Sequence, residues 1–148
     1  AYVVHQAEVL GEPETLERLT DAAFDPLEAV ILTEKPALAL EGGSSAAGST
    51  ARVVSYGPSR IVVDVDAVGD GILVMSEVFY PGWRAHVDGN PTQIHRANHA
   101  FRAVEVEAGS HRVELAYEPL SLKLGSVVSL ASLVLIVAVA IRGRVVRS

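Results

Sequence analysis

The chain has 148 residues, a formal net charge of −6 and no cysteine. Because an acidic chain without a basic stripe lacks the electrostatic signature of a nucleic-acid-binding protein, we expect no nucleic acid as a partner. Disulfides are excluded, so residues 1–120 must be held together by their own hydrophobic core, for which they are long enough.

The first segment, residues 1–41, is predicted to form a strand, a helix and a second strand. A strand is expected at 2–10, and Pro13 then favours a short helix because its fixed φ suits the first helical turn. A short apolar strand follows at 29–32. The Gly/Ser-rich stretch at 42–50 has the composition of a flexible loop. The chain begins without a signal peptide, so we expect a piece of a longer membrane protein.

The segment 51–120 has the pattern of an antiparallel β-sandwich. Apolar and acidic residues alternate along 60–67, which predicts a strand with one buried and one exposed face. The stretch 72–79 is apolar on both faces and is expected to be a central strand. Asp88 and Gly89 form a dipeptide typical of tight hairpins. Turn signals recur every 8–12 residues or so, as in sandwich folds.

The last part of the chain predicts a transmembrane helix at 121–142. Residues 124–141 carry no charge, and as a helix they would rise roughly 27 Å, close to the ~30 Å hydrocarbon core of a bilayer. Positive charges are concentrated after this run, at Arg142, Arg144 and Arg147. The positive-inside rule then places the tail 143–148 in the cytoplasm and residues 1–120 on the extracytoplasmic side of the membrane. A buried core helix is the alternative.

Small residues within this predicted helix suggest how it packs. Gly125 and Ser129 are four residues apart, and small residues at this spacing let membrane helices approach closely. We therefore expect contacts with the bilayer and with upstream transmembrane helices of the same chain. A lone anchor with incidental small residues remains the alternative.

No arrangement of residues predicts a catalytic, cofactor-binding or metal-binding site in this chain. His95 and His99 have a spacing that could hold a metal on a helix, but they lie between predicted strands, and solvated loop histidines are the default. Asp64 and Asp66 could act as paired carboxylates, but the alternation of their strand favours an exposed surface face. No phosphate loop or nucleophile motif can be assembled.

Four residues could bind a sugar: Tyr80, Trp83, Asn98 and Arg102. Aromatic faces stack on the C–H faces of sugars, while hydroxyl groups need directional polar partners such as Asn and Arg. The alternative is that Trp83 is a core anchor and Arg102 a surface charge, since buried Trp residues are common in sandwiches.

The run YPGW at 80–83, followed by the DG pair at 88–89, is the most specific motif of the chain. With the segments 96–98, 101–104 and 108–111, it resembles the C-terminal region of the bacterial YfhO-like membrane proteins. Nearly the whole chain takes part in this resemblance, and its specific part runs from 72 to 119.

The resemblance implies a polytopic membrane protein similar to GT-C glycosyltransferases. Such enzymes take sugar from a polyprenyl-phosphate carrier and transfer it outside the membrane, for example onto cell-envelope polymers. Their catalytic acids lie in an early extracytoplasmic loop, so none can be assigned here. The resemblance implies a C-terminal accessory module that helps to place a cell-envelope glycan. The alternative is a non-catalytic, membrane-tethered carbohydrate-binding or structural ectodomain.

Overall fold

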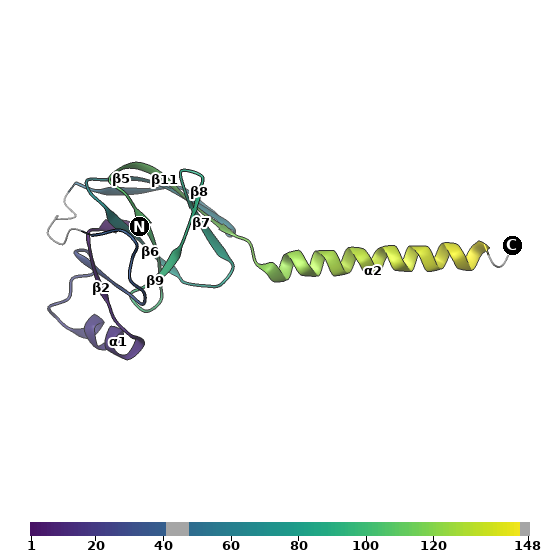
Figure 1. Cartoon of the computed structure of the whole chain (residues 1–148), viewed down its shortest axis with the longest axis horizontal. Helices are drawn as coiled ribbons and strands as arrows, with labels where there is room; N and C mark the ends of the chain where they lie inside the picture. The colour runs from purple at the N-terminus through teal and green to yellow at the C-terminus, as the bar shows by residue number, and fades with distance from the viewer. Residues whose placement is uncertain (41–47, 146–148) are drawn as a thin grey trace. The chain divides into compact units, whose positions relative to one another are not determined.

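The computed structural model describes residues 1–40 and 48–145, so the predicted loop at 42–50 lies mostly outside the described residues. The chain divides into two compact units, Ala1–Tyr117 and Glu118–Ser148. The first unit contains the strands and a short helix, and the second contains the long helix α2 (Figure 1).

One sheet of the first unit has six strands among the described residues, and it includes the N-terminal part of the chain. Its strands, in spatial order, are β1 (Tyr2–Val4), β6 (Gly71–Val78), β10 (Phe101–Val106), β9 (Ile94–Ala97), β3 (Ala29–Leu32) and β2 (Gln6–Val9). All neighbours pair antiparallel except β2 and β3, which are parallel. This parallel pair lies within 1–41, outside the segment 51–120 for which antiparallel pairing was predicted. The physical reason for the parallel pairing is the helical crossover between these two strands, which brings the chain back in the same direction.

The other sheet has five strands within the described ranges, and all of them pair antiparallel. Its strands, in spatial order, are β4 (Thr50–Tyr56), β5 (Arg60–Ala67), β11 (Gly109–Tyr117), β7 (Trp83–Val87) and β8 (Asn90–Thr92). The alternation predicted for β5 is present, because Ile61, Val63 and Val65 are buried. Asp88 and Gly89 join β7 to β8 with φ values of 51° and 83°. Such positive values suit a tight hairpin turn and are what glycine tolerates without steric penalty.

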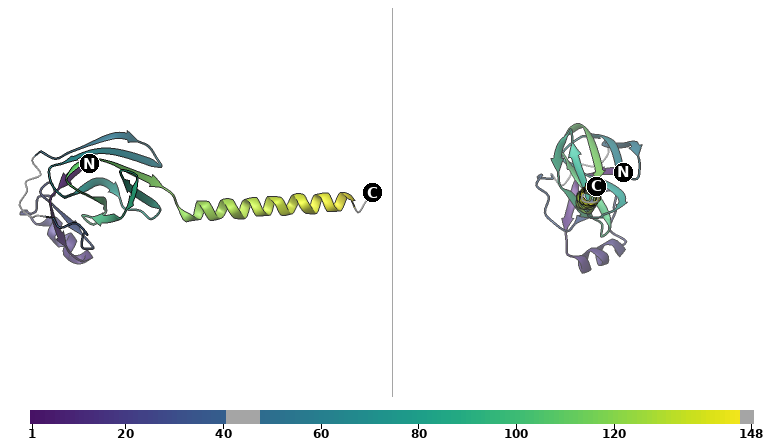
Figure 2. Two further views of the ribbon diagram at one scale, coloured as in Figure 1. Left: turned by 45° about the horizontal axis from the view of Figure 1, so that its top comes forward. Right: turned by 90° about the vertical axis from the view of Figure 1, so that its right-hand side faces the viewer.

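Two hydrophobic clusters show where the core sits. The first contains side chains of both sheets, including Val63, Leu73 and Leu115, and therefore fills the space between them. The strands of the first unit can be followed in Figure 2. The second includes Val30 and Ile72 and involves only strands of the six-stranded sheet, so that sheet is covered on both faces. This arrangement explains why β6 is apolar on both sides. The core also shows why β1 and β3 belong to the same folded unit as the later strands.

Helix α1 (Glu12–Thr20) connects β2 to β3 (Figure 1). It begins after Gly11, has Pro13 in its first turn, and carries acidic residues there, where the positive end of the helix dipole favours them. The buried Thr15 hydroxyl donates a hydrogen bond to the Gly11 carbonyl at 2.7 Å. The short N-terminal helix expected from Pro13 is thus present.

Helix α2 (Leu120–Val145) requires a correction of the predicted fold class. Among the residues that the structure describes, no helix is long and apolar enough to cross a membrane. The predicted span at 121–142 is therefore wrong, and the orientation inferred from it for 1–120 and for the tail 143–148 loses its basis.

Candidate functional site

Three of the four predicted sugar-binding residues lie close together at one end of the sandwich. Trp83 begins β7 in the five-stranded sheet, and Arg102 lies on β10 in the six-stranded sheet. The Arg102 guanidinium carbon is 4.2 Å from the centre of the Trp83 ring. The Tyr117 ring lies 5.5 Å from Trp83 and 6.3 Å from Tyr80, measured between ring centres. These contacts link the two sheets through an aromatic and cationic cluster.

Arg102 is an interior side chain and not a surface charge, because it is only 3% exposed. Its Nη2 lies 3.3 Å from a carboxylate oxygen of Glu77, while its Nε and Nη1 have no hydrogen-bond partner in the described part of the chain. Burial lowers the pKa of Arg102, and the charge of Glu77 opposes this. The Tyr56 hydroxyl donates to Glu77 at 2.6 Å, which raises the pKa of that tyrosine. This end of the core is therefore covered by a polar network of Arg102, Glu77 and Tyr56.

Asn98, the fourth predicted residue, has a different role in the structure. It lies in the turn between β9 and β10 with a φ of 45°, and it is 7% exposed. Its side-chain oxygen accepts a hydrogen bond from the backbone N–H of Ile31 at 2.9 Å. The backbone N–H of Asn98 donates to the Ile31 carbonyl at 2.8 Å. Asn98 thus attaches the turn to β3, and its side-chain oxygen is already occupied there.

We expect Asn98→Ala to lower the free energy of unfolding by about 2 kcal/mol, because a buried N–H loses its acceptor and alanine disfavours the left-handed backbone. Asn98→Gly removes the same acceptor without the backbone strain, so its cost should be smaller. Urea denaturation of both variants would measure the difference. An Asn98→Ala midpoint equal to that of the unsubstituted chain would contradict this role.

The two histidines with metal-ligand spacing bind different partners. His95 Nε2 lies 2.7 Å from a Glu105 oxygen, and His99 Nδ1 lies 3.0 Å from a Glu12 oxygen. Within the described ranges, no group of three or more His, Asp or Glu side chains could hold a metal ion. The predicted acidic pair is also engaged, since Asp64 contacts Arg112 at 3.0 Å and Asp66 accepts a hydrogen bond from Ser110.

A pocket of about 240 Å³ lies beside the aromatic cluster, and we call it the aromatic pocket. It is lined by Phe79, Tyr80, Pro81, Trp83, Arg84, Ala85, His86, Pro91, Thr92 and Ile94. Tyr80 is 60% exposed, so its ring is open to solvent. Arg84, His86 and Thr92 add polar side chains to the lining that also contains the aromatic residues Phe79, Tyr80 and Trp83. Such a combination can bind a sugar through stacking and directional hydrogen bonds.

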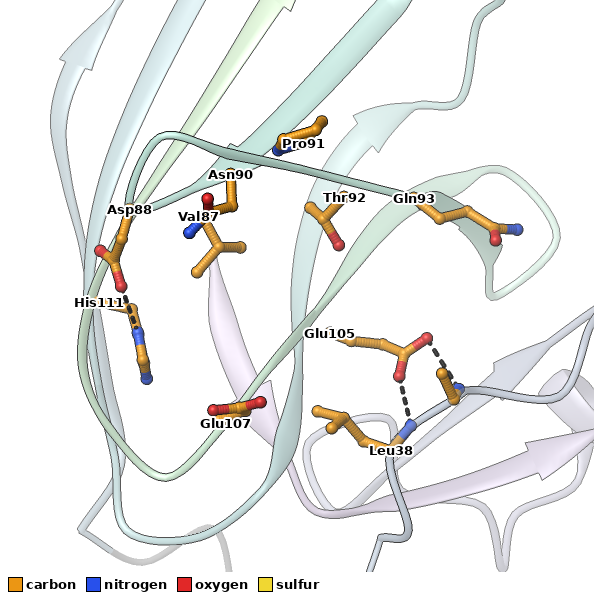
Figure 3. A pocket seen from close by; sticks show the side chains of 11 residues that line it. Leu38, Val87, Asp88, Asn90, Pro91, Thr92, Gln93, Glu105, Glu107 and His111 are labelled. Atoms are coloured by element: carbon orange, nitrogen blue, oxygen red, sulfur yellow. Dashed lines mark hydrogen bonds and ion pairs between the residues drawn. The ribbon is translucent and has the colours of Figure 1, made fainter.

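A second pocket of about 500 Å³ lies between β8 and β10, and we call it the carboxylate pocket (Figure 3). It is lined by Ala37, Leu38, Val87, Asp88, Asn90, Pro91, Thr92, Gln93, Glu105, Glu107 and His111. Figure 3 shows Asp88 and His111 on one side of it and Glu105 with Leu38 on the other. The aromatic and carboxylate pockets share Pro91 and Thr92, so they adjoin along β8.

The carboxylates of this second pocket are held by specific donors. Glu105 accepts hydrogen bonds from the N–H groups of Ala37 and Leu38 at 3.0 and 2.7 Å and from His95. Burial by itself would raise the pKa of Glu105, but these bonds outweigh it and the pKa lies below its ordinary value. The backbone N–H of Arg112 and the ring of His111 likewise lower the pKa of Asp88. Both groups are therefore ionised at neutral pH.

The carboxylate pocket was not predicted as a binding site from the sequence. Its residues come from three separated stretches, at 37–38, 87–93 and 105–111, and the predicted DG hairpin lies in the second of them. Glu105 and Glu107 are two apart, a spacing that places side chains on one face of an extended strand. That spacing is the one local signal that could have pointed to the pocket.

Comparisons with known proteins agree on one family. The family model described as "Bacterial membrane protein YfhO" matches residues 45–129, which is more than half of the chain. The chain is also similar to a curated protein of Bacillus subtilis (strain 168), named "Uncharacterized protein YfhO", with 25% identity over 84 residues. That match covers 57% of this chain but only 10% of the relative. No solved structure matches the chain.

Proposed function

Because the chain belongs to the YfhO family of bacterial membrane proteins, we propose that it is an extracytoplasmic accessory module of a polytopic, GT-C-like glycosyltransferase. The parent protein would take sugar from a polyprenyl-phosphate donor, and this module would help to place a cell-envelope glycan as acceptor. Its partners would then be that glycan, the lipid bilayer and upstream transmembrane helices of the same chain. The extracytoplasmic location in this proposal rests on the family resemblance and not on α2.

The aromatic pocket is the observation that supports a glycan ligand. Of its three aromatic residues, Phe79 and Tyr80 follow strand β6 and Trp83 begins β7. The polar residues Arg84, His86 and Thr92 line the same pocket. Tyr80 is the exposed ring, whereas the guanidinium of Arg102 lies over the ring of Trp83. Within this proposal, Tyr80 therefore stacks on the sugar, and Trp83 supports the wall of the pocket.

The alternative is a non-catalytic structural ectodomain, and the Arg102 cluster favours it. Trp83 and Arg102 already contact each other across the two sheets, and Trp83 packs against the main core. If the cluster acts only in packing, substitution of Tyr80 would leave the affinity for a glycan unchanged. The two proposals thus differ in a measurable way at that single exposed side chain.

We expect Tyr80→Ala to weaken the binding of a neutral cell-wall oligosaccharide about five- to tenfold, because it removes the exposed stacking surface. The 1–117 unit, which contains both hydrophobic clusters in full, can be titrated by calorimetry or by NMR. Tyr80→Phe is the matched control, because it keeps the ring and loses only the hydroxyl. Equal affinities of the Tyr80→Ala variant and the unsubstituted unit would contradict the glycan proposal.

A further inference from the structure

The aromatic and carboxylate pockets adjoin along one short edge strand. Both are lined by Pro91 and Thr92 of β8, and among the described strands β8 pairs only with β7. A ligand in the aromatic pocket can therefore continue into the carboxylate pocket without crossing a sheet. We propose that the ligand is a linear glycan that lies across β8, and that its unit in the carboxylate pocket carries a protonated amino group. This inference rests on the proposed glycan-binding function.

The charges around the carboxylate pocket select the class of ligand. Asp88, Glu105 and Glu107 line it, and no Lys or Arg is among its lining residues. Asp88 and Glu105 stay ionised, for the reasons given above. The only basic group of the lining is His111, whose Nδ1 lies 2.7 Å from Asp88. An anionic polymer would be repelled here, whereas a cationic group would be attracted.

Glu107 is the carboxylate best placed to receive that cationic group. Unlike Asp88 and Glu105, it has no hydrogen bond or ion pair to the described residues, and it lies directly after β10. Figure 3 shows it between Asp88 and Glu105 along the pocket. An ammonium group donates charge-assisted hydrogen bonds to a carboxylate, which are stronger than those of a neutral hydroxyl. The pocket volume of about 500 Å³ lies within the range of small-molecule sites.

The test compares oligosaccharides that differ only in charge. A short β-linked glucosamine oligomer, its fully N-acetylated counterpart and an oligouronate are titrated into the 1–148 chain. We expect the amino oligomer to bind roughly three- to fivefold more tightly than the acetylated one, and the oligouronate to bind least. Because the difference arises from partly exposed charges, it should shrink as the salt concentration is raised to about 0.5 M.

Matched variants assign the preference to one side chain. Glu107→Gln should abolish the preference for the amino oligomer, whereas Glu28→Gln, the same change at an exposed position outside the pocket, should retain it. Tyr80→Ala should weaken both oligomers by the same factor. Equal binding of the two oligomers, or a preference that survives in Glu107→Gln, would overturn the inference and leave the proposed function standing. If neither oligomer binds, the inference and the proposed function both fail.

Discussion

Trp83→Ala is expected to lower the free energy of unfolding of the 1–117 unit by about 3–5 kcal/mol. The indole packs against the core between the two sheets, contacts Tyr117 and lies beneath the Arg102 guanidinium. Its removal leaves a cavity at the end of the sandwich and exposes the apolar surface of both sheets. Urea denaturation, followed by far-ultraviolet circular dichroism, would measure the shift in the midpoint.

Arg84→Ala provides the control for this change, because Arg84 is an exposed neighbour on the same strand. We expect its free energy of unfolding to stay within about 0.5 kcal/mol of that of the unsubstituted unit. Stability and glycan affinity of the Trp83→Ala variant, measured together, separate a role in the core from a role in sugar binding. A Trp83→Ala variant that keeps its stability but loses glycan affinity would make the indole a sugar platform and not a core anchor.

Local patterns predicted those parts of the fold that depend on neighbouring residues. The alternation along 60–67 identified the buried face of β5, and the DG pair identified the hairpin between β7 and β8. The apolar stretch at 72–79 indicated an interior strand, which the cores on both sides of β6 explain. In each case the sequence pattern and the structural feature that it predicts involve the same few consecutive residues.

Long-range pairing was beyond these patterns. The parallel pair of β2 and β3, and the contact of β3 with β9, depend on residues far apart in the sequence. Because a short apolar strand can pair on either side and in either direction, its own sequence does not choose the partner. The anchoring of Ile31 by Asn98 is the kind of tertiary contact that makes this choice.

The candidate site shows the same division. Sequence reasoning selected Tyr80, Trp83 and Arg102, which are clustered in the structure, because the YPGW run and nearby polar residues stand out locally. It also treated Arg102 as either a ligand-binding group or a surface charge. Burial of this side chain depends on Glu77 and on the facing sheet, and no pattern around 102 reveals either of them.

Arg102 gives the second large effect, and two substitutions separate its packing from its charge. We expect Arg102→Ala to lower the free energy of unfolding by about 3 kcal/mol, because it removes a buried aliphatic stem and the contact with Trp83. Arg102→Met restores most of that volume without a charge. Its stability should lie within about 1 kcal/mol of that of the unsubstituted unit, since desolvation of a buried charge largely offsets its ion pair.

The geometry explains why methionine should suffice at this position. The guanidinium makes one ion pair, at 3.3 Å, to a Glu77 side chain that is 33% exposed, and its Nε and Nη1 have no partner among the described residues. After the substitution, Glu77 can still be solvated and can still accept the hydrogen bond of Tyr56. Denaturation midpoints of both variants test this expectation. If Arg102→Met were as unstable as Arg102→Ala, the charge itself would stabilise this end of the core, through its attraction to Glu77 and to the indole face.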